Sequence, residues 1–212
     1  STVLMLSACS ATDPDPDPEA PVDERIEIPA APAEGVQWVT PDLEIPAFEE
    51  KLMCYFDTYE GPEVGVLEFN GYQSLGGHHV VVNGTTVSPL DFADGELVDC
   101  TDSEMVDLSP LMVGGELGSE ENEQKTTLAF PDGMAAKLKS GQRIIVQSHY
   151  INYTDQPILV RDVANFFTAA PETVETWTAP FVHIQTEHPI GAGEERSLSF
   201  SCEFEVDLSI LF

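Results

Sequence analysis

The feature that most restricts the fold of this chain is the alternation of short apolar runs and turn signals that begins at Lys51. Asn70-Gly71, Asn83-Gly84 and Asp94-Gly95 are dipeptides typical of tight turns. Helical periodicity is absent between them, and residues 135–139 are expected to form at most one helical turn. The spacing predicts an all-β chain, an antiparallel β-sandwich of the jelly-roll type with about eight strands. Strands are expected at residues 52–58, 63–69, 80–82, 126–130, 143–153, 158–168, 173–185 and 196–211.

The N-terminal part of the chain reads as an export signal followed by a spacer. Residues 1–9 have the character of the end of a secretory signal, and Leu6-Ser7-Ala8-Cys9 resembles the bacterial lipobox, in which the cysteine receives a lipid. The alternative is an ordinary short apolar N-terminus. Residues 10–46 are rich in proline and aspartate, which predicts a disordered linker, and its later part, near Trp38, is a candidate for contact with the domain. We therefore expect an exported protein, anchored by lipid on Cys9 to a bacterial cell envelope membrane, with a folded domain over residues 47–212.

The charge balance narrows the range of partners. The chain has 8 basic and 38 acidic side chains, which gives a formal net charge of −30. Nucleic acids and anionic membranes both attract clustered basic residues, so this composition disfavours both as electrostatic partners. The charge is typical of a solvated surface, and no local motif points to a basic partner.

Two adjacent histidines stand at the start of an apolar run, in Gly76-Gly77-His78-His79-Val80. Successive residues of a regular strand point to opposite faces, so His78 and His79 can share a ligand only where the backbone departs from regular pleating. The preceding glycines permit such a departure. Paired imidazoles are useful mainly as transition-metal ligands, and the alternative is a strand end with partly solvated rings.

A third imidazole, His149, lies near the end of the apolar run at residues 143–150. Three neutral imidazoles suit copper or zinc better than magnesium or calcium. Gln147 shares the expected face of His149 and is a candidate for orienting its ring. His183 and His188 are interpreted as solvated strand-end residues rather than as a second metal site.

The four cysteines are compatible with an exported protein. Cys54 and Cys100 flank the histidine pair in sequence, and an oxidising compartment can join such a pair. If Cys9 carries a lipid, Cys202 is left over, and an odd cysteine in an exported protein indicates a missing partner. The alternative for Cys202 is a buried free thiol.

The order of these features resembles a known family. The shared order is Cys54, then Gly77-His78-His79-Val80-Val81-Val82, then Pro131-Asp132-Gly133-Met134, then Val146-Gln147-Ser148-His149-Tyr150, then Ser199-Phe200-Ser201-Cys202. Over roughly residues 45–212 it is similar to the N-terminal domain of the copper type II, ascorbate-dependent monooxygenases, the family of peptidylglycine alpha-hydroxylating and dopamine beta-monooxygenases.

The resemblance implies a jelly-roll domain in which His78, His79 and His149 hold an electron-transfer copper that ascorbate reduces. It also implies a disulfide between Cys54 and Cys100, and a bond from Cys202 to a second domain. In the family that second domain carries another copper, which activates molecular oxygen and is bound by a His-X-His motif and a methionine.

This chain contains no His-X-His motif, so the catalytic-copper domain is expected to be missing from it, together with the catalytic residues. Hydroxylation of a substrate, which the sequence does not identify, is expected of the complete protein rather than of this fragment. The alternative function is a non-catalytic copper- or zinc-binding β-sandwich module at the cell surface, and a purely structural sandwich is a third possibility.

Overall fold

The computed structural model describes residues 20–101, 108–113, 125–179, 190–199, 201 and 203. The chain divides into two compact units, residues 1–180 and residues 181–212. Within the second unit, the described residues contain a turn closed by a hydrogen bond from Glu194 N to Gly191 O. Across the described residues, no helix has the length and apolarity that a membrane span requires.

The first unit is all-β, as predicted. A single 3-10 turn, η1 (Pro171–Thr173), interrupts its described strands. The strands are β1 (Val22–Asp23), β2 (Gly35–Val39), β3 (Leu43–Ile45), β4 (Glu50–Tyr59), β5 (Val64–Tyr72), β6 (Gly77–Thr85), β7 (Leu97–Asp99), β8 (Leu108–Val113), β9 (Lys125–Ala129), β10 (Met134–Leu138), β11 (Gln142–Ile151), β12 (Ile158–Val160), β13 (Val163–Ala169) and β14 (Thr176–Thr178).

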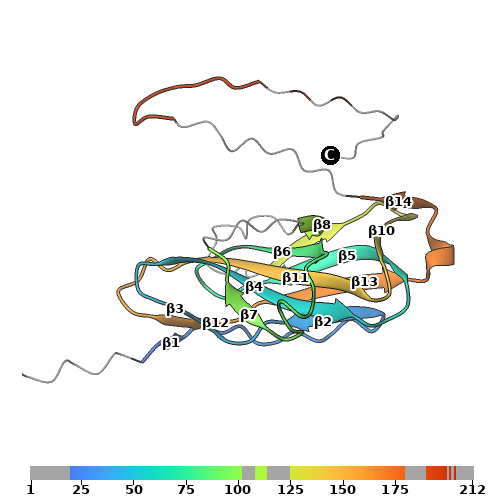
Figure 1. The fold of residues 1–212 in the computed structure, drawn as a ribbon, viewed down its shortest axis with the longest axis horizontal. Coiled ribbons are helices and arrows are strands. Elements are labelled where there is room, and N and C mark those ends of the chain that lie inside the picture. The colour runs from blue at the N-terminus through green and yellow to red at the C-terminus, as the bar shows by residue number, and fades with distance from the viewer. Residues whose placement is uncertain are drawn as a thin grey trace, which may run out of the picture. The chain divides into compact units, whose positions relative to one another are not determined.

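Two large sheets form the sandwich (Figure 1). One has the strand order β14-β10-β5-β13-β2, with β9 also paired to β5, and the other has the order β7-β4-β11-β6-β8. A small third sheet has the order β1-β12-β3. All but two of the described pairings are antiparallel; β1 with β12 and β10 with β14 are parallel. The predicted, mainly antiparallel β-sandwich is therefore confirmed, although its two large sheets contain more strands than the eight expected.

The main core lies between the two large sheets, because both contribute buried apolar side chains to one cluster. Val80 and Val82 of β6 and Ile144 and Val146 of β11 come from one sheet. Phe166 of β13 comes from the other. Along β11 the intervening residues point to the opposite face of the sheet, as the period of two requires.

A separate apolar cluster covers part of that opposite face. Cys54, Phe56 and Ile145 are buried there beneath the segment that ends at Cys100. Phe92 of this segment stacks on Phe56, with ring centroids 4.6 Å apart. The predicted disulfide between Cys54 and Cys100 is present and closes a loop of 46 residues. A closure of this length contributes about 4 kcal/mol in the chain-entropy account.

Part of the expected linker belongs to the fold. Residues 20–46 carry β1, β2 and β3, so the predicted domain boundary at residue 47 is wrong for this segment. Trp38, Leu43 and Ile45 are almost fully buried, and Trp38 packs edge-on against Phe166 at 5.0 Å between ring centroids. The free energy gained by burying these apolar side chains is sufficient to fold the segment, although the flanking sequence is rich in proline and favours an extended chain.

Two other predictions of secondary structure differ from the structure in detail. Residues 158–168 were expected as one strand, but the chain bends at Arg161 and Asp162, and β12 and β13 enter different sheets. Residues 135–139, where at most one helical turn was expected, fall almost entirely in β10, and Ala136 and Leu138 are buried in the main core. This alternation has the period of a strand, which the short run of alanines concealed.

Candidate metal centre

A β-bulge brings the two adjacent histidines together. In the antiparallel pairing of β6 with β11, His149 lies opposite His79 and Tyr150 lies opposite Gly77. His78 is therefore the extra residue of the bulged strand, and His78 and His79 together oppose His149. The predicted departure from regular pleating is confirmed at this position.

Glycine is required at each of the two positions before the bulge, for a different structural reason. Gly76 has φ +83°, a backbone conformation that residues with a Cβ rarely adopt. Its carbonyl accepts a hydrogen bond of 2.9 Å from Ile151 N, which ties the turn to the end of β11. At Gly77 a Cβ atom would lie 2.6 Å from Gln73 Cβ, so a side chain does not fit there.

The Nδ1 atoms of the three histidines form a compact triangle. The separations are 3.0 Å between His78 and His79, 3.2 Å between His78 and His149, and 3.4 Å between His79 and His149. A tetrahedral ion bound at about 2.0 Å from each nitrogen keeps its ligand nitrogens about 3.3 Å apart. The three predicted ligands are thus spaced as donors to one metal ion.

A bound cation would relieve an electrostatic repulsion within the triangle. Each neutral imidazole presents at Nδ1 either one hydrogen or one lone pair. Among three mutually adjacent Nδ1 atoms at least two are of the same kind, and like groups at this distance repel each other. A cation that accepts all three lone pairs removes the repulsion.

The environment of His79 favours the neutral, ligating form of its ring. Burial is the main cause that lowers the pKa of His79 from 6.5 to about 4, and the neighbouring His149 and His78 lower it further. The ring therefore keeps a lone pair for a metal ion at neutral pH. His78 is exposed, whereas His79 and His149 are half-buried, so the site is reached from solvent on the side of His78.

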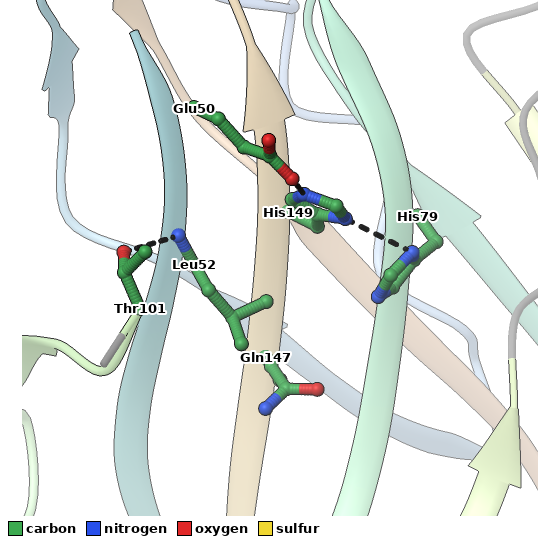
Figure 2. Close-up of a pocket in the computed structure, with 6 residues that line it drawn as sticks. All are labelled: Glu50, Leu52, His79, Thr101, Gln147 and His149. Carbon is green, nitrogen blue, oxygen red and sulfur yellow. Dashed lines mark hydrogen bonds and ion pairs between the residues drawn. The ribbon is translucent and has the colours of Figure 1, made fainter. Parts of the chain in front are cut away.

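A carboxylate contacts one of the three rings from behind. Glu50 Oε1 lies 2.7 Å from His149 Nε2, and Figure 2 shows His149 between Glu50 and His79. Glu50 carries no distinctive signal in the sequence, because the acidic pair Glu49-Glu50 looks like a solvated loop. Only the register of β4 against β11, which places Leu52 opposite His149, identifies Glu50 as a neighbour of the site.

An open pocket of about 240 Å³ lies beside the histidines. It is lined by Glu50, Leu52, His79, Thr101, Gln147 and His149 (Figure 2). The amide nitrogen of Gln147 is 3.9 Å from Cys54 Sγ, so this side chain lies between the disulfide and the histidines. That Gln147 orients an imidazole stays a prediction.

The fold and the site together define a β-sandwich with a three-histidine centre that could hold a metal ion. No protein-family model and no curated protein matches the chain. The remaining residues singled out from the sequence, Cys9, His183, His188 and Cys202, lie outside the residues that the structure describes.

Proposed function

We propose that this chain is the electron-transfer domain of an exported, copper- and ascorbate-dependent monooxygenase. The observation that carries the proposal is the triangle of Nδ1 atoms of His78, His79 and His149, with sides of 3.0 to 3.4 Å. When bound there, copper supplies one-electron redox chemistry, with ascorbate as the reductant.

The donor set supports copper. All three donors are neutral imidazoles, which bind both Cu(I) and Cu(II), and they stand on paired strands whose hydrogen bonds restrict movement of the rings. A site of this kind can change oxidation state without a large change in its protein ligands. Zinc is compatible with the same donors, so the choice of copper rests on the family resemblance.

The proposal includes where the protein is located and which second domain it works with. The disulfide between Cys54 and Cys100 supports export, because disulfides form and persist in oxidising compartments. A lipid on Cys9 would anchor the protein to a bacterial envelope membrane. A second domain, reached through Cys202, would hold the catalytic copper and would bind molecular oxygen and an unidentified substrate.

The ligand assignment is tested by metal content. We expect the purified protein, loaded with copper and desalted, to retain one copper per chain, and His149→Ala to lose most of it. His188→Ala is the matched control, because it removes a histidine that the proposal does not use. Full copper stoichiometry in His149→Ala would contradict the assignment.

The type of function is tested by redox cycling of the same samples. An electron-transfer centre is expected to be reduced by ascorbate and reoxidised by air over many cycles, which the electron paramagnetic resonance signal of Cu(II) reports. A site that holds zinc in preference, or copper that ascorbate does not reduce, would instead indicate the non-catalytic metal-binding module.

A further inference from the structure

The contact between Glu50 and His149 is the part of the centre that the proposed function does not use. His149 directs Nδ1 to the other histidines and Nε2 to Glu50 Oε1, at 2.7 Å. A neutral imidazole carries its hydrogen on one nitrogen only. A carboxylate at Nε2 keeps that hydrogen on Nε2, and Nδ1 is then left with the lone pair that a metal ion requires.

We infer that Glu50 is a positioning residue for the metal: it fixes the tautomer and orientation of His149 and stabilises bound Cu(II) more than bound Cu(I). The inference deepens the proposed function and rests on it for the identity of the metal. A hydrogen bond to a carboxylate makes the imidazole a stronger donor. The negative charge also interacts more strongly with the ion of higher charge.

The strand register explains how Glu50 reaches the site. In the pairing of β4 with β11, Ile151 lies opposite Glu50 and His149 lies opposite Leu52. Glu50 and Leu52 are two residues apart and therefore share a face, which makes Glu50 the diagonal neighbour of His149. A glutamate side chain is long enough to span that diagonal, and the 2.7 Å contact shows that it does.

The contact is poorly placed to stabilise the fold. The Glu50 side chain is 61% exposed, whereas that of His149 is 16% exposed. Exposed ion pairs contribute about 0–1 kcal/mol to stability. Within the described part of the chain, this is the only carboxylate within ion-pair distance of a ring of the centre. The position of Glu50 is therefore better suited to orienting His149 as a metal ligand than to stabilising the β-sandwich.

The neighbouring residue Glu49 supplies a matched control. Glu49 carries the same charge one residue away, but its carboxylate lies 3.2 Å from Lys51 Nζ. Glu50→Gln and Glu49→Gln therefore change the net charge equally, and only the first alters the partner of His149. Glu50→Ala, which also removes the hydrogen-bond acceptor, is the second variant at this position.

The experiment measures the Cu(II) and Cu(I) affinities of the whole chain, by competition with chelators, and the reduction potential of the bound copper. We expect Glu50→Gln to weaken Cu(II) binding by about 10- to 100-fold and Cu(I) binding by less. A tenfold larger loss for Cu(II) than for Cu(I) raises the potential by about 59 mV. Glu50→Ala should change both quantities in the same direction, and Glu49→Gln should resemble the wild type.

The outcomes separate the inference from the proposed function. If the wild type binds copper and Glu50→Gln matches Glu49→Gln in both affinities and in potential, the role of Glu50 is wrong and the copper site stands. If the wild type binds only zinc, the copper proposal fails. In that case a loss of zinc affinity in Glu50→Gln alone would still support the positioning of His149, and unchanged zinc affinity would overturn it. Thermal unfolding of the metal-free variants is expected to match the wild type.

Discussion

At the scale of single residues, the centre depends on backbone freedom as much as on ligand chemistry. His78 and His79 are neighbours in sequence, and a regular strand would direct them to opposite faces. The bulge removes that restriction, and its extra residue, His78, lies two residues after Gly76, whose φ is +83°. The histidines provide the donor atoms, and the glycine permits the backbone path that makes them converge.

Gly76→Ala, with Gly95→Ala as its control, tests the role of this backbone freedom. Both glycines have nearly the same positive φ, +83° and +82°, so an alanine at either should lower the free energy of unfolding by about 1–2 kcal/mol. At Gly76 the new Cβ also lies 3.2 Å from Ile151 O, beside the bulge, whereas at Gly95 nothing lies within 4 Å. We expect only Gly76→Ala to weaken metal binding, measured by chelator competition. Equal metal affinity in both variants would contradict this account of the bulge.

At the scale of elements, β11 connects the three-histidine centre to a buried polar network. His149 faces the centre, and the next residue, Tyr150, points into the protein and donates a hydrogen bond to the carboxylate of Asp162. The same carboxylate accepts a hydrogen bond of 3.0 Å from Gln73 Nε2. Asp162 stands at the bend between β12 and β13, so the network joins the end of β11 to the point where the chain changes sheets.

This network predicts a dependence of stability on pH. Burial is the main cause that raises the pKa of Asp162 from 3.8 to about 6. The folded protein therefore holds this proton more tightly than the unfolded chain does, and the stabilisation is complete below about pH 4 and is lost as the pH rises to 6. Relative to Asp162→Asn, the free energy of unfolding of the wild type should fall by up to about 3 kcal/mol across this window.

Denaturant unfolding at intervals of pH, on both proteins without metal, measures that difference. The comparison with Asp162→Asn removes the contribution of the other carboxyl groups, because both proteins share them. A difference that stays constant between pH 4 and pH 6 would show that the pKa of Asp162 is the same in the folded and unfolded protein, and that its hydrogen-bond partners offset the cost of burial.

The elements also show which parts of the fold are predictable from the sequence. The long strands β4 and β11 follow from their apolar runs, and the three histidines follow from their position at strand ends. The turns expected at Asn70-Gly71 and Asn83-Gly84 are wrong, because both pairs lie inside strands, β5 and β6, that are paired on both sides. Glu50 could not be identified, because its proximity to His149 depends on the register of β4 against β11. Contact of Trp38 with the domain is a sequence-based expectation, but its strand, β2, is not, because proline and acidic residues dominate its surroundings and conceal a short strand that tertiary packing stabilises.

At the scale of the whole molecule, the dominant property is the net charge of −30. Charges of one sign create a field that acts on a charged reactant before contact, and salt screens that field. The surroundings of the centre share the sign, because Glu50 contacts His149 and the nearby Lys51 is paired with two carboxylates, those of Glu49 and Asp99. Ascorbate is a monoanion at neutral pH, so the proposed reductant approaches a surface that repels it.

The last prediction follows from this repulsion. We expect the bimolecular rate constant for reduction of the Cu(II) protein by ascorbate to rise several-fold between about 10 mM and 150 mM salt, where the screening length falls from about 30 Å to about 8 Å. Hexaammineruthenium(II), a cation that also transfers one electron, should show the opposite trend because the same field attracts it. Stopped-flow absorbance of the copper centre measures both rates under identical conditions. If both rate constants changed in the same direction with salt, the reductant would not experience the field of the whole protein, and reduction would be governed by groups in direct contact with the centre.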